Sequence, residues 1–179
     1  MEDYAYVLDV LPEGRPDSKR RFRREAVVYG LGIEEFKIFD MKPIEGAAIN
    51  IGDRCYIGKE TEERTQIDHV RARVNFVELT HTAQSELGFV LDEIVKENEE
   101  KFIQFYNHAG PISRRYHSLE LIPGLGKKTM NLIVDNRPYV TFKEMEEKIP
   151  NFRNPEKYIS QRIENEIKES DQKYRLFVR

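Results

Sequence analysis

The chain has 179 residues, of which 39% are hydrophobic and 34% charged, and its formal net charge is −3. It contains no apolar run long enough to span a bilayer and no signal-peptide pattern at its start, so we expect a cytoplasmic protein outside the membrane. Cys55 is the only cysteine, which excludes an intrachain disulfide and a multi-cysteine metal site. The histidines lack the spacing of metal ligands, and we expect no cofactor.

The acidic net charge hides two basic segments. Residues 12–24 hold six bases against two acids, and residues 101–128 hold five bases against one acid, so each segment has a net charge of +4. Residues 60–100 hold four bases and eleven acids, a net charge of −7. The distribution of charge, rather than its sum, therefore decides whether an anionic partner can bind.

Strand patterns dominate the first 78 residues. Residues 4–11 are rich in aromatic and β-branched side chains and are followed by a segment rich in proline and glycine. Shorter strand patterns follow over residues 26–30, 35–41, 54–57 and 66–78. Several short strands separated by turns are typical of a small barrel or sandwich.

From Thr80 onward the pattern is helical. A buried stripe at helical spacing comprises Leu87, Val90, Leu91, Ile94 and Val95. Further helices are predicted, in chain order, over residues 99–109, 113–121 and 127–135, after Thr141, and from Pro155 to about residue 169. Residues 171–179 return to a strand pattern, which we expect to pair with the N-terminal sheet.

The segment Ile122-Pro123-Gly124-Leu125-Gly126-Lys127-Lys128 lies between two of the predicted helices and reads as a tight turn. Its glycines leave the backbone bare where a partner could approach. We expect the amides of Gly124, Gly126 and Lys127 at the start of the second helix, where the helix dipole favours an anion. With two lysines directly behind them, a nucleic-acid phosphate is the expected ligand. The plain alternative is a turn between helices that uses glycine only for its shape.

This segment resembles the helix–hairpin–helix family, which has a glycine, a hydrophobic residue and a second glycine between two helices. The resemblance implies contact between the hairpin amides and phosphates of DNA or RNA, without sequence specificity. It also implies that the backbone carbonyls of Glu120, Ile122 and Leu125 can hold a monovalent cation. Residues 149–167 resemble a degenerate second copy, with Asn151 and Arg153 at the glycine positions.

The whole chain is similar to the archaeal family called domain of unknown function 655. The similarity includes Asp53-Arg54-Cys55-Tyr56-Ile57-Gly58, Leu79-Thr80 and the hairpin. It implies an α+β fold with an OB-like N-terminal part, RNA or nucleotide binding, and a role in translation or RNA metabolism. We expect four parts: an OB-like small β-barrel domain (1–78), a helical linker (79–112), a helix–hairpin–helix domain (113–170) and a terminal strand (171–179).

Two further basic groups are candidate phosphate contacts. The first is the run Lys19, Arg20, Arg21, Arg23 and Arg24, which is either a clamp on an RNA backbone or a solvated loop. The second is Arg114 and Arg115, which precede the hairpin. On a helix these two side chains are about 100° apart, so at most one shares a face with Lys127.

Two other functions remain open. The hairpin also resembles that of base-excision glycosylases, in which a lysine at the position of Lys128 attacks the sugar and forms a Schiff base. The downstream aspartate of those enzymes has only Asp135 as its nearest match, and the histidine of their motif is missing. Alternatively, the acidic block 60–100 could bind a basic protein partner of the ribosome or transcription machinery. The favoured hypothesis is nucleic-acid binding without catalytic residues, with RNA preferred over DNA on the family resemblance alone.

Overall fold

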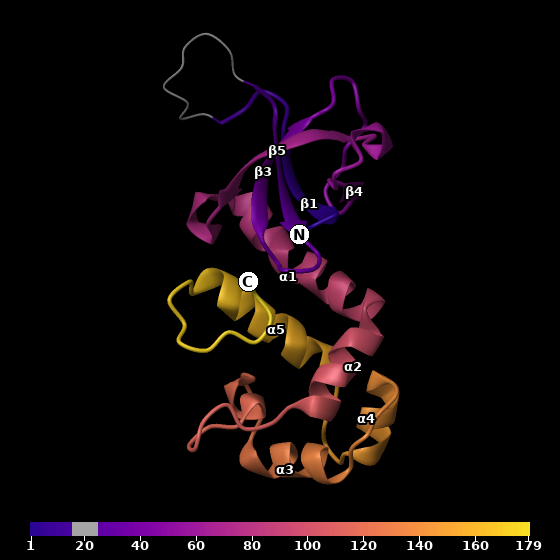
Figure 1. The fold of residues 1–179 in the computed structure, drawn as a ribbon, viewed down its shortest axis with the longest axis vertical. Coiled ribbons are helices and arrows are strands. Elements are labelled where there is room, and N and C mark those ends of the chain that lie inside the picture. Colours follow the sequence, from indigo (N-terminus) through magenta and orange to yellow (C-terminus); the bar gives the residue numbers. More distant parts are fainter. Residues whose placement is uncertain (16–24) are drawn as a thin grey trace. The chain divides into compact units, whose positions relative to one another are not determined.

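The computed structural model describes residues 1–15 and 25–179 (Figure 1). Its elements, in chain order, are β1 (Tyr4–Leu11), β2 (Val27–Gly32), β3 (Ile38–Pro43), β4 (Arg54–Tyr56), η1 (Thr61–Glu63), β5 (Ile67–Val74), η2 (Phe76–Glu78), α1 (His81–Glu97), α2 (Glu99–His108), η3 (Ser118–Leu121), α3 (Lys127–Asp135), α4 (Phe142–Lys148) and α5 (Pro155–Lys168), where η marks a 3₁₀ helix. The predicted α+β class is confirmed. None of the helices in the described ranges has the length and apolar content needed to cross a bilayer.

The chain divides into two compact units. The sheet unit comprises Met1–Val90 and Ile167–Arg179, and the helical unit comprises Leu91–Glu166. The first half of α1 therefore groups with the sheet, where Ala83 and Leu87 are fully buried. The predicted linker 79–112 is divided between the two units, because a single long helix carries buried side chains in both.

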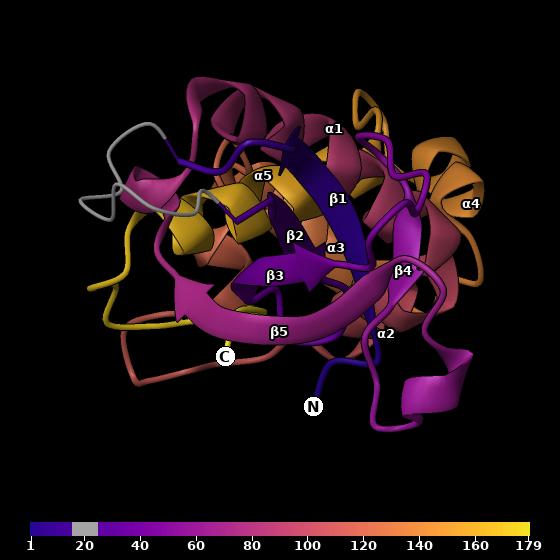
Figure 2. The same cartoon turned by 90° about the horizontal axis from the view of Figure 1, so that it is seen from above.

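A five-stranded antiparallel sheet in the order β4-β1-β2-β3-β5 forms the sheet unit. It curls into a half-barrel, as Figure 2 shows. The pairing of β1 with β2 shifts register between Val7 and Asp9, and such a bulge increases the local twist of a strand. Among the described residues, β4 and β5 each pair with one neighbour, so the sheet has two edges.

Small and branched side chains fill the core of the curled sheet. All six residues of the central strand β2 are buried. Cys55 is buried, and burial raises the pKa of its thiol to about 11. The core cluster comprises Ala5, Val7, Val28, Met41, Cys55, Ile57 and Ile67.

Local backbone geometry moves two predicted strand boundaries. The prediction began the third strand at residue 35, but Phe36 has a φ of 58°, a left-handed conformation that a strand does not contain. β3 therefore begins at Ile38. The prediction continued the fifth strand to residue 78, but Asn75 and Glu78 form a capping box, and this turns the chain into η2 after Val74.

The predicted terminal strand 171–179 is wrong, since the structure has turns and bends there. The amide of Arg179 donates to the carbonyl of Glu35 at 3.1 Å, and Nη2 of Arg73 donates to the carbonyl of Arg179 at 3.1 Å. Glu35 lies in the connection between β2 and β3 rather than on an edge strand. One backbone hydrogen bond at such a position does not start a ladder.

Buried tyrosines and an asparagine hold the helical unit together. The hydroxyl of Tyr106 donates to the carbonyl of Pro155 at 2.7 Å, and the hydroxyl of Tyr139 donates to the carbonyl of Ile133 at 2.6 Å. The side-chain amide of Asn107 both donates to and accepts from the backbone of Tyr139, at 2.8 Å each. These bonds join α2, the end of α3 and the start of α5. The predicted helices after Thr141 and from Pro155 are confirmed as α4 and α5.

The predicted helix over residues 113–121 is wrong for its first half. Only Ser118–Leu121 is helical, as η3. The hydroxyl of Ser113 accepts from the amides of Arg115 and Tyr116 at 3.2 Å each, and this offers the backbone an alternative to helical hydrogen bonds. Residues 111–117 therefore form a loop before η3.

Candidate nucleic-acid interface

The hairpin of residues 122–126 joins η3 to α3 and is anchored by apolar side chains. Leu119 and Ile122 are 0% and 2% exposed. The amide of Leu125 donates to the carbonyl of Ile122 at 3.3 Å and closes the turn. Gly124 has a φ of 80°, a left-handed conformation that glycine adopts without strain. The sequence correctly predicted the turn and the helix over 127–135 that follows it.

The amides at the start of α3 are open to a ligand. Gly126 is the N-cap of α3 and has no side chain that could cap the helix. Across the described residues, no hydrogen bond engages the amides of Gly124, Gly126 or Lys127. These three residues and Lys128 are exposed, and a Cβ built on Gly126 meets nothing within 4 Å. Uncapped amides and the positive end of the helix dipole together favour an anion here.

The turn between α4 and α5 repeats the geometry of the hairpin. Ile149 is the C-cap of α4, as Ile122 is of η3, and a proline follows each isoleucine. Asn151 stands at the position of Gly124 and has a φ of 59°. Asparagine tolerates the left-handed region better than most residues with a side chain. The two turns therefore share a left-handed residue at the equivalent position, two residues after the isoleucine.

The second turn differs from the first in what its amides do. The amide of Asn154 donates to Oε1 of Glu146 at 2.8 Å, so a side chain of the protein already occupies it. Pro155 opens α5 and has no amide hydrogen. Arg153 has a large side chain where the first turn has Gly126. The second turn therefore lacks the open amides that the first presents at Lys127 and Lys128, because Glu146 occupies the amide of Asn154 and Pro155 has none.

A buried arginine links α5 to the base of the hairpin. Nη1 of Arg162 donates to the carbonyl of Leu121 at 3.1 Å, and its Nε donates to Glu166 at 2.8 Å. Arg162 is 7% exposed and Glu166 is 1% exposed. The Glu166 carboxylate compensates the charge of this guanidinium, and the nearby carbonyl of Ile122 accepts from the amide of Leu125 at 3.3 Å. The monovalent-cation site at the carbonyls of Glu120, Ile122 and Leu125 stays a prediction.

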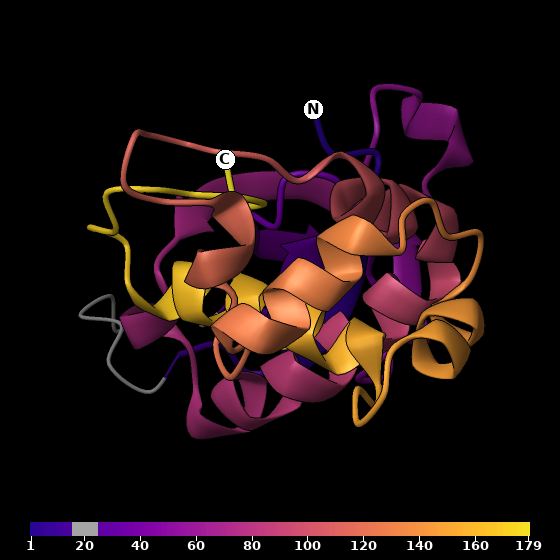
Figure 3. The same cartoon turned by 90° about the horizontal axis from the view of Figure 1, so that it is seen from below.

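Arg114 and Arg115 lie in the loop 111–117 instead of on a helix. Both are exposed. Figures 1 and 3 show this loop projecting away from α3, and no hydrogen bond or ion pair in the described ranges joins either arginine to the hairpin. The helix on which at most one of them was expected to share a face with Lys127 does not form at these positions. The run Lys19, Arg20, Arg21, Arg23 and Arg24 lies outside the described residues.

His117 shapes the segment just before the hairpin. Its Nδ1 accepts from the amide of Leu119 at 3.1 Å, and its amide donates to Glu120 at 2.7 Å, which completes a capping box around η3. Burial and the nearby charge of Arg137 lower the pKa of His117 below its ordinary value. The neutral ring is the form that accepts a hydrogen bond at Nδ1. This cap could not be seen from the sequence, because it depends on the position of the His117 ring over the amide of Leu119.

The sheet unit carries an aromatic and cationic cluster on β1 and β4. The guanidinium of exposed Arg54 lies 3.9 Å from the centre of the Tyr4 ring. The rings of Tyr4 and Tyr56 pack edge to face with their centres 5.4 Å apart. Aromatic rings and guanidinium groups of this kind can contact a base. The pairing of β1 with β4 brings Arg54 and Tyr56 to Tyr4, and a strand pattern in the sequence does not show which strands pair.

The geometry gives little support to the lyase alternative. Lys128 is exposed, whereas a Schiff-base lysine is commonly activated by removal from water. Asp135 is at the opposite end of α3, about 10 Å along the helix axis from Lys128 at 1.5 Å per residue. The two side chains therefore do not form an acid–base pair.

Several carboxylates of the acidic block 60–100 already have partners within their own unit. Oε1 of Glu99 accepts from the amide of Phe142 at 2.7 Å. Asp92 accepts from Ser160 at 2.6 Å and from Lys157 at 2.9 Å. The block is also divided between the two units at Val90. Part of the negative charge of the block therefore serves hydrogen bonds and an ion pair inside the helical unit.

The chain therefore combines an antiparallel half-barrel with a helical unit that contains two related turns. It belongs to the family described as protein of unknown function DUF655, whose model matches residues 1–179. The family prediction is thus confirmed over the whole chain. The uncharacterized protein MJ0038 of Methanocaldococcus jannaschii is 42% identical, over 99% of this chain and 80% of that protein. The crystal structure of Af1531 from Archaeoglobus fulgidus, a member of the same family, is similar with a TM-score of 0.91 and 38% identity, over 99% of this chain and 100% of that one.

Proposed function

We propose that this chain is a non-catalytic nucleic-acid-binding protein that holds backbone phosphates at the start of α3. The observation that carries the proposal is the exposed, uncapped set of amides at Gly124, Gly126 and Lys127. A phosphate oxygen accepts hydrogen bonds from such amides, and Lys127 and Lys128 add two positive charges beside them. The family resemblance favours RNA over DNA and a role in RNA metabolism or translation.

The proposal treats the helical unit as a pair of helix–hairpin–helix motifs. The second turn has the left-handed residue of the first, but Glu146 occupies the amide of Asn154 and Arg153 replaces the second glycine, so we assign it a structural part. The contact through Arg162 supports this division, since α5 of the second motif holds the base of the first hairpin. Phosphate contacts of this kind position a nucleic acid without reading its sequence.

The proposal also treats the sheet unit as an OB-like half-barrel. Five antiparallel strands that curl with open edges are compatible with the partly open form of that barrel. The Tyr4, Arg54 and Tyr56 cluster would then be a secondary contact for bases. We assign the primary contact to the hairpin, because its free backbone amides are hydrogen-bond donors suited to phosphate.

Binding of fluorescent oligonucleotides, measured by anisotropy, tests the proposal. Gly126→Val adds a side chain in front of the open amides, in an extended conformation that valine adopts readily (φ −76°, ψ 163°). We expect this variant to lose at least about tenfold in affinity, the effect of losing one or two charge-assisted hydrogen bonds. The weaker helix cap costs about 1 kcal/mol of stability, which circular dichroism will monitor.

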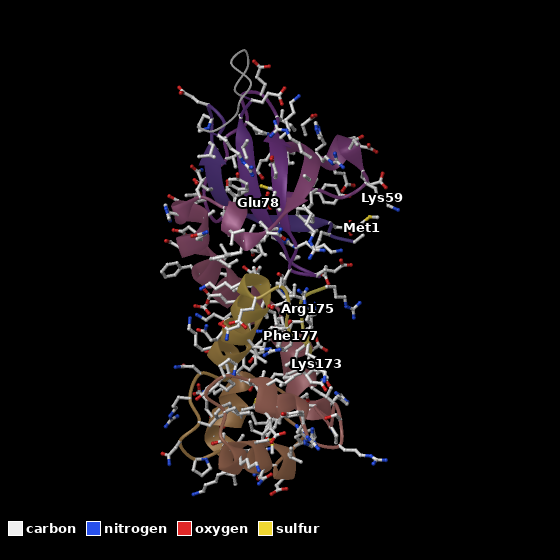
Figure 4. The ribbon with its side chains drawn as sticks, turned by 90° about the vertical axis from the view of Figure 1, so that its left-hand side faces the viewer. Met1, Lys59, Glu78, Lys173, Arg175 and Phe177 are labelled. Carbon is white, nitrogen blue, oxygen red and sulfur yellow. The ribbon has the colours of Figure 1, made fainter. Side chains whose placement is uncertain are left out.

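Removal of charge gives a second test with a matched control. Lys127→Gln/Lys128→Gln should weaken binding and flatten its salt dependence. Lys59→Gln/Lys143→Gln removes the same charge from two exposed lysines elsewhere, Lys59 being on the sheet unit (Figure 4). If about three phosphates are neutralised, log K should fall with log salt at a slope of about −2 to −3 in the wild type. Equal losses in both double variants, or a flat salt response in the wild type, would contradict the proposal.

A further inference from the structure

We propose that the loop 111–117 binds an unpaired base of a single-stranded nucleic acid, with Tyr116 stacking on the base and Arg114 and Arg115 holding the phosphates beside it. This inference rests on the proposed function, and it adds a contact that separates single strands from duplexes. The hairpin amides make no such distinction, because both kinds of nucleic acid present phosphates.

The loop is a closed structure in the described chain. The amide of Ser118 donates to the carbonyl of Gly110 at 2.9 Å, and Pro111 forms an isolated β-bridge with His117. The amide of Ile112 donates to the carbonyl of Tyr116 at 2.8 Å. These contacts pair the two arms of the loop along their length. A preorganised loop loses less conformational entropy when it binds.

Two positive charges lie at the tip of this loop. The hydroxyl of Ser113 accepts from the amides of Arg115 and Tyr116, which fixes the turn that carries Arg114 and Arg115. Both arginines are exposed, and the described residues show no ion pair with either of them. The sequence between Lys101 and Glu120 contains no acidic residue. A guanidinium pair without a compensating acid is suited to phosphate, which arginine can contact through two parallel hydrogen bonds.

Apolar surface adjoins the two charges. Tyr116 is 50% exposed and Ile112 is 37% exposed, although most aromatic rings of this unit are buried. An aromatic ring that is half exposed beside arginines is the arrangement by which proteins stack the bases of single strands. Phosphate binding alone would not use this apolar surface.

Stacking on Tyr116 requires a base with an open face. In a duplex, both faces of a base are covered by its neighbours, so the ring cannot stack without disrupting the helix. In a single strand the bases can be splayed out and stacked on an aromatic side chain. The chemistry of the loop therefore favours single-stranded RNA or DNA over a duplex of the same sequence.

The experiment compares affinities for an unstructured uridine-rich strand and for its duplex, as RNA and as DNA, by anisotropy. Tyr116→Ala should weaken binding of the single strand about tenfold, the usual effect of losing one stacked base. It should leave binding of the duplex within about twofold. Tyr116→Trp should restore single-strand binding, because tryptophan also stacks. A strand containing 4-thiouridine should form a photocrosslink to the peptide that includes Tyr116.

Controls separate this inference from the proposed function. Val140→Ala removes exposed apolar surface elsewhere in the same unit, where Val140 is 77% exposed, and should leave both affinities unchanged. If Lys127→Gln/Lys128→Gln weakens binding of both ligands while Tyr116→Ala changes neither, the hairpin function stands and this inference fails. Equal losses for single strand and duplex in Tyr116→Ala also overturn it. If the wild type binds neither ligand, the proposed function fails and this inference fails with it.

Discussion

Arg162 donates a hydrogen bond from Nη1 to the carbonyl of Leu121 at 3.1 Å, across 41 residues of sequence. Leu121 ends η3, immediately before the hairpin turn. Arg162 also pairs with Glu166 one turn further along α5, and both side chains are buried. The position of the candidate phosphate site therefore depends on a charged group in the core of the helical unit.

Arg162→Met should strongly destabilise the helical unit. It leaves the Glu166 carboxylate buried without its arginine, and breaking a buried ion pair from one side typically costs about 3–5 kcal/mol. Arg162→Met/Glu166→Leu removes both charges and should recover most of that loss. Chemical denaturation followed by circular dichroism measures both variants. A double variant as unstable as the single one would show that the ion pair itself, and not the orphaned charge, dominates.

The backbone conformations of Gly124 and Asn151 predict which substitutions the hairpin tolerates. Gly124→Ala places a side chain in the left-handed region and should cost about 1 kcal/mol. Gly124→Asn should cost less, because Asn151 adopts the same region at the equivalent position with a φ of 59°. Thermal unfolding compares the two variants. An alanine variant more stable than the asparagine variant would contradict this account.

The cap of η3 should weaken in acid. The folded protein holds His117 with a pKa lowered by burial, so the unfolded chain binds a proton more readily than the folded one. The stability that the neutral ring contributes is therefore complete above the unfolded pKa of about 6.5, and it is lost as the pH falls through the lower folded pKa. His117→Asn keeps an N-cap acceptor that does not titrate. Unfolding measured across this pH range should show a smaller slope for the variant, and identical slopes would contradict the prediction.

Thr80 should be important for the start of α1. Its hydroxyl donates to the buried carboxylate of Asp9 at 2.5 Å and accepts from the amide of Ala83 at 3.1 Å. Thr80→Val removes both bonds with little change in shape, and we expect a loss of about 1–3 kcal/mol. Thr80→Ser retains the hydroxyl and serves as the control. Equal stability of the valine and serine variants, measured by urea denaturation, would show that these bonds contribute nothing.

The sequence located most of the elements but misjudged some of their ends. Strand and helix patterns depend on nearby side chains, so β1, α3, α4 and α5 were predicted close to their observed bounds. The errors lie where a local polar contact competes with the pattern. The Ser113 hydroxyl accepts a backbone hydrogen bond, and a loop forms where the first half of a helix was predicted. The capping box of Asn75 ends a strand earlier than predicted.

By itself the sequence determined the turn at residues 122–126, because proline fixes one φ angle and glycine at 124 allows the left-handed conformation that the turn needs. The availability of its amides was decided only by the tertiary structure, in which Glu146 occupies an amide of the second turn and no side chain of the described residues bonds those of Gly124, Gly126 and Lys127. The role of Arg162 was equally hidden, since burial and pairing depend on residues that are distant along the chain. Local sterics are encoded by neighbours in sequence, whereas burial and hydrogen-bond partners arise only when separate elements pack together.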